Sequence, residues 1–182
     1  MQTNSHTQRL TRLALAVALI AVCTWISIPM AIPFTMQTFA IFAILGLLGG
    51  KYGTAAILSY LLAGLLGLPV FSGFRAGPAV LFGNTGGYLL GFLVMGLCYW
   101  LLTHWLGERP WVMFCALLLG LLLLYLFGSL WFLLVYAPGT GSMGFGSVLT
   151  LCVFPFALPD LAKLALALLL IRRLKPHLTR LA

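Results

Sequence analysis

The chain alternates apolar runs with short breaks rich in glycine, proline or charge. Six apolar segments result, at roughly 11–28, 36–50, 53–68, 86–105, 111–136 and 147–171. The second and third, at about 15 residues each, are shorter than the roughly 20 residues that an upright membrane span needs. Because Gly49–Gly53 separates them, we expect two short helices there rather than one long helix. The pattern predicts an all-α integral membrane protein built as a compact six-helix bundle.

Composition supports a membrane protein with one domain. The 182 residues are 63% hydrophobic and 7% charged, whereas soluble domains have about 25% charged residues. We expect a polar N-terminal tail at 1–8, a single six-helix membrane domain at 9–173 and a basic cytoplasmic tail at 174–182. The first apolar run lacks a small-residue cleavage site, so we interpret it as a retained helix rather than a signal peptide.

The positions of the charges predict the topology. With six spans and the N-terminus inside, the cytoplasmic side holds Arg9, Arg12, Lys51, Arg109, Arg172, Arg173, Lys175 and Arg180, and the outer loops hold only Arg75. This asymmetry fits the positive-inside rule, with both termini in the cytoplasm. The net charge of +8 therefore indicates topology, and we expect no nucleic-acid partner. The basic C-terminal residues anchor at the headgroups or attract anionic membrane lipid.

The sequence lacks the motifs that are expected of an enzyme. The four cysteines lie in or beside apolar runs, and no histidine is spaced to complete a metal site with them. The chain has no P-loop and no nucleophile–base motif within the spans. We expect neither catalysis nor a metal or cofactor in this chain, so any ATP hydrolysis must come from another subunit.

Asp160 and Lys163 are charged residues inside the sixth apolar segment. A charge near the centre of a membrane helix costs about 2.5–3.5 kcal/mol, so it usually faces a partner or a polar cavity. The i, i+3 spacing places both side chains on one helix face. Two interpretations follow: a ligand or ion site, or a neutral pair that only joins helices.

The two long outer loops carry little charge. Loop 69–85 is rich in glycine and aromatic residues, so we expect it to pack over something, either as a hydrophobic lid or as a substrate gate. Its Arg75 is either an anion contact or an exposed loop residue. Loop 137–146 is also uncharged, and its glycines predict flexibility.

Four motifs occur in an order that resembles a known family. They are Ile32–Phe39, Gly67–Phe71, Gly83–Gly91 and Asp160-x-x-Lys163. Together they resemble BioY, the biotin-binding S component of energy-coupling-factor (ECF) vitamin transporters. The resemblance spans Arg12 to about Arg173. It implies six helices, cytoplasmic termini, a biotin site near the outer face, a transmembrane coupling protein and two ABC-type ATPase subunits. It also implies the cytoplasmic (inner) membrane of a prokaryote.

The resemblance makes biotin the expected ligand, and its chemistry suits the residues of these motifs. Biotin offers two ureido N–H donors, a ureido carbonyl, an apolar bicycle and a carboxylate. Asp160 can accept from the ureido N–H groups, and Lys163 can donate to the ureido oxygen, the carboxylate or Asp160. The remaining candidates are Gln37, Asn84, Tyr88 and Arg75 as polar contacts, and Phe34, Phe71 and Phe74 as walls.

Some of these residues have a plain structural alternative. Gln37 can form an interhelical hydrogen bond, Asn84 can cap the helix that follows it, and Tyr88 can belong to an interfacial belt. Ala14 and Ala18, small residues one turn apart, form the docking surface for the coupling protein if the resemblance holds, or else pack internally. The whole chain can alternatively be a solitary or ion-coupled secondary biotin or vitamin carrier with Asp160 as its protonation site, or a structural subunit.

Overall fold

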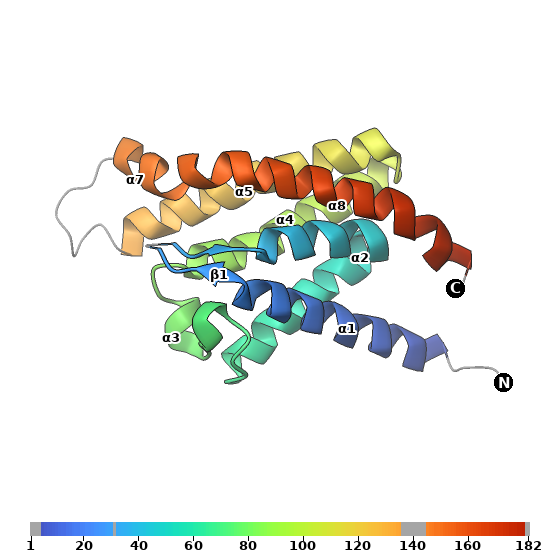
Figure 1. Ribbon diagram of the computed structural model, residues 1–182, viewed down its shortest axis with the longest axis horizontal. Coiled ribbons are helices and arrows are strands. Elements are labelled where there is room, and N and C mark those ends of the chain that lie inside the picture. The colour runs from blue at the N-terminus through green and yellow to red at the C-terminus, as the bar shows by residue number, and fades with distance from the viewer. Residues whose placement is uncertain (1–4, 31, 136–144, 181–182) are drawn as a thin grey trace.

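The computed structural model describes residues 5–30, 32–135 and 145–180. Within them the chain forms seven α-helices, a short 3₁₀ helix and one two-stranded ribbon (Figure 1). The elements are α1 (Ser5–Trp25), β1 (Ser27–Ile28), β2 (Phe34–Thr35), α2 (Gln37–Leu65), η1 (Ser72–Phe74), α3 (Pro78–Leu81), α4 (Gly86–Leu106), α5 (Pro110–Val135), α7 (Phe145–Cys152) and α8 (Phe154–Arg180).

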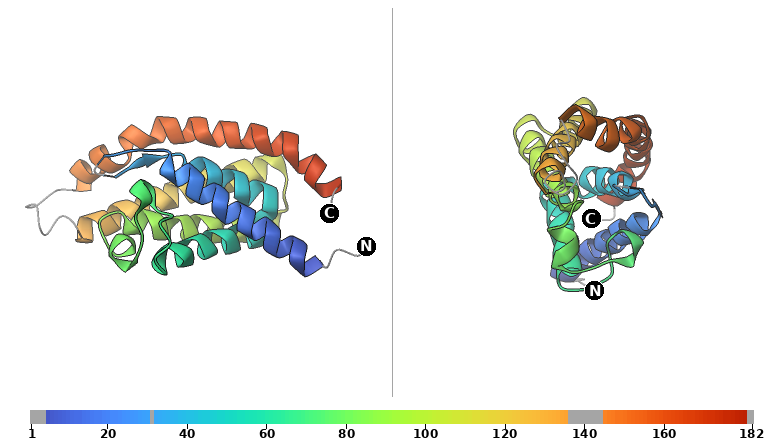
Figure 2. Two further views of the ribbon diagram at one scale, coloured as in Figure 1. Left: turned by 60° about the horizontal axis from the view of Figure 1, so that its bottom comes forward. Right: turned by 90° about the vertical axis from the view of Figure 1, so that its left-hand side faces the viewer.

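Five of the described helices, α1, α2, α4, α5 and α8, are long and apolar enough to cross a membrane. Their outward faces carry large apolar side chains such as Leu122 on α5 and Leu166 on α8, which are more than half exposed. A helix satisfies its own backbone hydrogen bonds, so such faces suit contact with lipid. The long helices run mostly along one common direction (Figure 2).

The second and third predicted segments both lie in α2, which is interrupted at Gly49. This residue has φ 78° and ψ 168°, a conformation that favours glycine. Figure 1 shows the ribbon turning back at this point. A Cβ on Gly53 would lie 2.9 Å from the backbone of Leu45, so glycine lets the two halves of α2 lie close together.

The sixth predicted segment is divided into α7 and α8 at Val153, which corrects the expectation of one helix over 147–171. Pro155 explains the break, because it has no N–H to donate to the preceding turn. Of the flexible loop predicted at 137–146, residues 137–144 lie outside the described residues, and the last two belong to α7.

A short ribbon joins α1 to α2 and is the one exception to the predicted all-α class among the described residues. Ser27 pairs with Thr35 and Ile28 with Phe34, in antiparallel register. Pro29 and Pro33 lie between the strands and do not continue a helix, so α1 ends at Trp25, earlier than predicted.

Segment 69–85, which we call the outer segment after its predicted topology, contains η1 and α3 and packs on the helix ends, as its composition predicted. The indole N–H of Trp25 donates to the Pro69 carbonyl at 2.9 Å, and the Tyr60 hydroxyl donates to the Val70 carbonyl at 3.1 Å. Phe71 is fully buried against Tyr60, with ring centroids 5.7 Å apart. These contacts fix the beginning of the segment against α1 and α2.

Helices α4 and α5 pack closely through glycines on both helices. A Cβ on Gly91 would meet Leu124, and one on Gly120 would meet Met95. Small residues allow helix axes to approach closely in membranes. Gly128 lies under the ring of Tyr88, and this contact sets the position of that ring.

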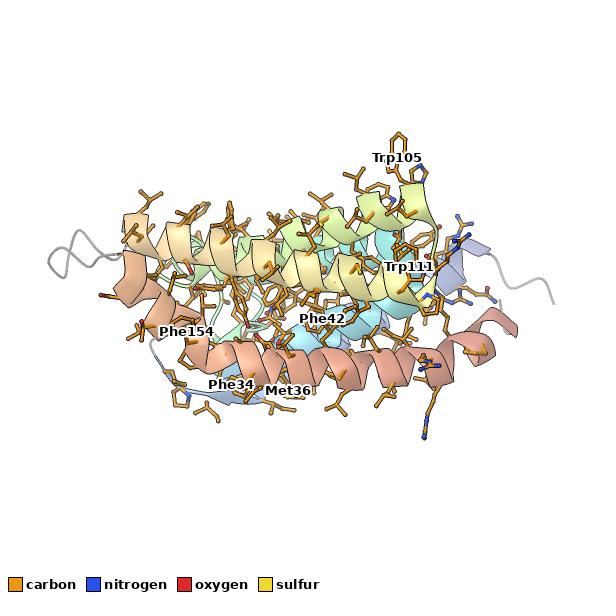
Figure 3. The ribbon with its side chains drawn as sticks, turned by 90° about the horizontal axis from the view of Figure 1, so that it is seen from above. Phe34, Met36, Phe42, Trp105, Trp111 and Phe154 are labelled. Atoms are coloured by element: carbon orange, nitrogen blue, oxygen red, sulfur yellow. The ribbon has the colours of Figure 1, made fainter. Side chains whose placement is uncertain are left out.

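Both ends of the described chain lie at the same end of the molecule, opposite the ribbon and α3 (Figure 1). Trp105 and Trp111 lie at the end that carries the termini (Figure 3). Helix α1 already begins at Ser5 and α8 continues to Arg180, so helical structure extends into both predicted tails.

Candidate functional site

Asp160 and Lys163 form an ion pair on the inner face of α8. The Lys163 ammonium lies 2.8 Å from Asp160 Oδ1, and both residues are almost fully buried, at 5% and 3% exposure. The i, i+3 spacing on a regular helix brings the two side chains together, as the sequence predicted.

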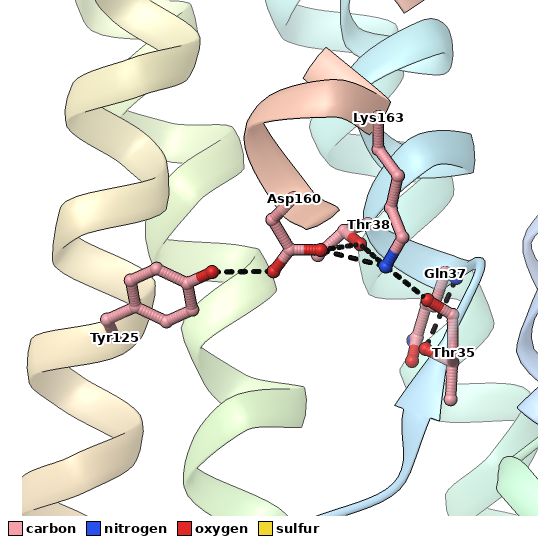
Figure 4. A network of polar contacts seen from close by, with 6 residues as sticks. All are labelled: Thr35, Gln37, Thr38, Tyr125, Asp160 and Lys163. Atoms are coloured by element: carbon pink, nitrogen blue, oxygen red, sulfur yellow. Dashed lines mark hydrogen bonds and ion pairs between the residues drawn. The ribbon is translucent and has the colours of Figure 1, made fainter. Parts of the chain in front are cut away.

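Asp160 also accepts hydrogen bonds from two other helices (Figure 4). The Thr38 hydroxyl of α2 donates to Oδ1 at 2.9 Å, and the Tyr125 hydroxyl of α5 donates to Oδ2 at 2.7 Å. The carboxylate therefore joins α2, α5 and α8. With Lys163 included, three donors contact a group that has about four acceptor positions.

Lys163 directs its ammonium at three acceptors. They are Asp160 Oδ1, the Thr35 carbonyl of β2 at 2.7 Å and the Thr38 hydroxyl at 3.1 Å. The ammonium also lies 3.9 Å from the centre of the Phe34 ring, which contributes a cation–π contact. Because an ammonium has three N–H donors, this arrangement uses all of them. Of the three roles predicted for Lys163, the structure shows contact with Asp160.

A cavity of about 80 Å³ adjoins this ion pair. Six of the predicted site residues line it: Gln37, Phe71, Arg75, Tyr88, Asp160 and Lys163. They come from α2, the outer segment, α4 and α8, so the fold brings together residues separated by more than a hundred positions. The cavity has the expected character of a small-ligand site, with apolar walls and a few polar groups.

Gln37 is a buried polar residue of the cavity with an unused donor. It is 4% exposed, and its side-chain amide nitrogen has no hydrogen-bond acceptor among the described residues. A buried polar group without a partner costs about 1–3 kcal/mol. An acceptor on a bound ligand would satisfy this donor.

Tyr88 and Arg75 contact the cavity from two sides. The Tyr88 ring is buried, and its hydroxyl lies 3.3 Å from that of Ser129, so it is not an exposed belt residue. Arg75 is exposed at the cavity edge, where its Nε donates to the Ser72 carbonyl at 3.0 Å. Its guanidinium has further donors beyond this bond.

Three predicted residues do not line the cavity. Asn84, predicted as a polar contact, is exposed. Its neighbour Thr85 both lines the cavity and occupies the N-cap position of α4, so the alternative of Asn84 as the cap is wrong. Phe34 instead packs against Lys163 and stacks on Phe156. Phe74 is 64% exposed and packs on Trp25, at 5.0 Å between ring centroids.

Sequence reasoning missed Thr35, Thr38 and Tyr125 as site residues. A signal for Tyr125 was present, because Tyr125 and Ser129 are hydroxyl residues one turn apart in a very apolar segment. Both point at the site, one toward Asp160 and the other toward Tyr88. A similar signal existed in the run Thr35–Thr38, whose two hydroxyl residues flank Gln37.

Ala14 and Ala18 lie on α1, which contributes no residue to the cavity lining, and both are exposed. The neighbouring Ala16 is 5% exposed and packs internally. The described residues contain no cluster of histidine, cysteine or acidic side chains that can hold a metal ion.

The sequence profile of the BioY family matches residues 1–180 of this chain. The chain belongs to the BioY family. Among its relatives, the biotin transporter BioY of Thermotoga maritima is 37% identical over 169 residues, which cover 92% of this chain and 96% of that protein. Biotin transporter BioY2 of Lactococcus lactis is 44% identical over 130 residues, covering 70% and 71%.

A solved structure has the same fold as this BioY-family chain. It is the crystal structure of the S-component for biotin from an ECF-type ABC transporter, with a TM-score of 0.84 and 26% identity, covering 97% of this chain and 95% of that chain. Its likeness and the five apolar helices establish a multi-pass membrane protein. The relatives are named as transporters, in agreement with the prediction that this chain is not an enzyme.

Proposed function

We propose that this chain captures biotin with high affinity and serves its uptake as the substrate-binding subunit of an ATP-driven ECF transporter. Its relatives carry the name of biotin transporters, and the solved neighbour is the S-component for biotin. The observation that carries the proposal is the buried Asp160–Lys163 pair beside a cavity lined by Gln37, whose amide nitrogen has no acceptor among the described residues.

Asp160 fits a ureido N–H group. Its Oδ1 accepts from Thr38 and Lys163, while Oδ2 accepts only from Tyr125 among the described residues. One acceptor position on Oδ2 is thus available for a ligand donor. Lys163 holds the carboxylate in position and is not itself free to bind the ligand, because its three donors are used within the protein.

Gln37 and Arg75 supply the complementary donors. The Gln37 amide nitrogen satisfies a ligand oxygen, for which the ureido carbonyl is the best match because both groups are neutral. Arg75 at the cavity edge is placed to meet the terminal carboxylate. Phe71 and Tyr88 then pack on the apolar bicycle and chain. The ligand in turn satisfies Gln37, which removes the cost of an unpaired buried donor.

The cavity must enlarge to hold biotin. Its volume of about 80 Å³ accommodates a few water molecules, whereas pockets for drug-sized ligands occupy about 300–1,000 Å³. The outer segment 69–85 contributes Phe71, Ser72 and Arg75 to the lining, and this segment contains no long helix. We assign it the role of the gate.

The proposed topology has six membrane segments, cytoplasmic termini and the cavity toward the outer face of a prokaryotic inner membrane. Helix α2 supplies two of the segments, on either side of Gly49. The half before the kink, residues 37–48, extends only about 18 Å at 1.5 Å per residue, so it does not cross the roughly 30 Å hydrocarbon core alone. The ribbon and the cavity fill the remaining depth, where irregular backbone lines a site.

The proposed partners are a transmembrane coupling protein and ABC-type ATPase subunits, and this chain itself carries no cofactor. The type of transporter named for the solved neighbour supports these partners. The exposed Ala14 and Ala18 on α1 provide the proposed docking surface, because small residues let another helix approach closely.

A biotin titration of the detergent-purified chain, measured by calorimetry with thiamine and riboflavin as controls, tests ligand capture. We expect one-to-one binding in the nanomolar range that is selective for biotin. A folded sample that binds none of the three vitamins, or all of them equally, would overturn the proposal.

A charge-neutral double variant, Asp160→Asn with Lys163→Met, separates a ligand site from a pair that only joins helices. Removing both charges avoids the unpaired buried lysine that Asp160→Ala leaves, which costs about 3–5 kcal/mol. We expect the double variant to fold and to lose biotin binding. Wild-type affinity in this variant would assign the pair a structural role alone.

Uptake into proteoliposomes distinguishes the ATP-driven transporter from an ion-coupled carrier. We expect accumulation of biotin only when coupling protein, ATPases and ATP are all present. Accumulation driven by a proton gradient with this chain alone would instead support the carrier with Asp160 as its protonation site.

A further inference from the structure

A second hollow lies at the opposite end of the molecule, between the start of α5 and the end of α8. Its volume is about 730 Å³. Its apolar walls include Trp111, Phe114 and Leu168, of which Trp111 is 60% and Phe114 42% exposed. We call this hollow the α5–α8 groove. It shares no lining residue with the cavity around Asp160.

The rim of the α5–α8 groove carries a net positive charge. Its charged lining residues are Glu108, Arg172 and Lys175. Glu108 Oε2 lies 2.6 Å from the Lys175 ammonium, so the carboxylate is neutralised by that lysine. Arg172 is exposed and forms no ion pair with any described residue. The groove thus pairs an apolar floor with one guanidinium at its edge.

The groove lies at the level of a membrane interface. Trp105 and Trp111 mark this end of the bundle in Figure 3, and tryptophans are enriched where helices leave the hydrocarbon region. The basic residues Arg109 and Arg173 are also exposed here, next to the lining residues in the sequence. A lipid in the groove would therefore place its acyl chains against apolar walls and its headgroup beside cationic side chains.

We propose that the α5–α8 groove binds one anionic phospholipid, with an acyl chain along the apolar walls and the phosphate group at Arg172. Charge complementarity and depth favour this occupant, because basic pockets between membrane helices suit anionic headgroups. A soluble protein segment would have to displace lipid from walls that face the bilayer. The proposal concerns a site separate from the one for biotin and does not depend on it.

Native mass spectrometry of the full-length protein in detergent tests the site, with phosphatidylglycerol and phosphatidylcholine of identical chains titrated separately. We expect one molecule of phosphatidylglycerol to bind per chain, with an affinity at least about fivefold higher than that of phosphatidylcholine. A cation near an anionic headgroup contributes about 1 kcal/mol, which corresponds to this ratio. Arg172→Gln should abolish this preference. The matched control Arg173→Gln removes the same charge from the adjacent position outside the lining and should keep it.

Two further measurements complete the test. Leu168→Trp fills the groove and should weaken both lipids, whereas soluble glycerol phosphate should not displace the bound lipid. Equal binding of the two lipids, equal loss in Arg172→Gln and Arg173→Gln, or full displacement by glycerol phosphate would overturn the proposal. Biotin affinity, measured in the same samples, should stay at the wild-type value, so failure of the lipid site is distinguishable from failure of biotin capture.

Discussion

At the scale of single residues, the site depends on how one carboxylate is held. Asp160 receives hydrogen bonds from Thr38, Tyr125 and Lys163, which lie on three different helices. A buried carboxylate is costly unless such donors replace the water it has lost. The same bonds leave little rotational freedom, so the last acceptor position points in a defined direction before a ligand arrives.

Tyr125→Phe should weaken biotin binding about 10- to 150-fold, because a hydrogen bond to a charged group contributes about 1.5–3 kcal/mol. The matched control is Tyr99→Phe, since Tyr99 is fully buried and its hydroxyl has no partner among the described residues. The control should retain its affinity within about twofold, a change of under 0.5 kcal/mol. Equal affinities of both variants in calorimetry would contradict the positioning role of Tyr125.

Gln37→Leu should lower biotin affinity by about 5- to 150-fold, because the ligand oxygen loses its donor at about 1–3 kcal/mol. The thermal stability of the protein without biotin should not fall, since the amide nitrogen makes no bond within the described residues. Thr54→Val is the control, as its hydroxyl is equally unpartnered but outside the cavity lining. A stability loss without an affinity loss in Gln37→Leu would assign Gln37 to helix packing.

At the scale of elements, glycines decide how closely segments approach the site. The Phe71 ring lies against Gly64 on α2, where a Cβ would overlap the ring. Gly77 of the outer segment donates to the Gly64 carbonyl at 2.8 Å. The end of α2 therefore sets the position of the proposed gate and of one cavity wall.

Gly64→Ala should displace the Phe71 ring and weaken biotin binding, with an overpacking cost of about 1–3 kcal/mol. Gly146→Ala on α7 is the matched control, because a Cβ there would have no neighbour within 4 Å. Thermal unfolding and biotin titration of both variants would measure the effect. Unchanged affinity in Gly64→Ala would mean that Phe71 does not form a wall of the occupied site.

At the scale of the whole molecule, the proposed ligand site and the proposed docking surface lie on different elements. The ion pair and its cavity adjoin the ribbon and the outer segment, and the ribbon lies at the end of the molecule opposite the termini (Figure 1). The face of α1 that carries Ala14 and Ala18 is not covered by the described chain. Ligand capture and assembly can therefore be altered separately.

Replacing both Ala14 and Ala18 with tryptophan should abolish assembly with the coupling protein and leave biotin affinity unchanged. The bulky rings prevent close approach of a second helix, while the cavity contains no residue of α1. Leu122→Trp, on the exposed face of α5, is the control and should assemble normally. Co-purification of the complex measures the effect, and normal assembly of the double variant would contradict docking at this surface.

The apolar pattern by itself determined the membrane class and most of the helix positions. Membrane helices need long apolar runs, and this requirement leaves few alternatives for segments such as 86–105 and 111–136, which match α4 and α5 closely. The i, i+3 spacing likewise determined that Asp160 and Lys163 share a face, because it depends only on helix geometry. The sequence also indicated the interruption at Gly49, because a cluster of glycines is a local signal that does not depend on packing between helices.

Only the tertiary structure decided which groups from other helices meet that pair. Tyr125 reaches Asp160 because α4 and α5 pack on glycines and α8 crosses beside them, and no local pattern encodes that approach. Long-range packing also places the ribbon, whose Thr35 carbonyl accepts from Lys163. It likewise decides that Asn84 is exposed while its neighbour Thr85 is partly buried. Sequence fixes periodicity along one helix, whereas hydrogen bonds between helices depend on how their axes are placed in three dimensions.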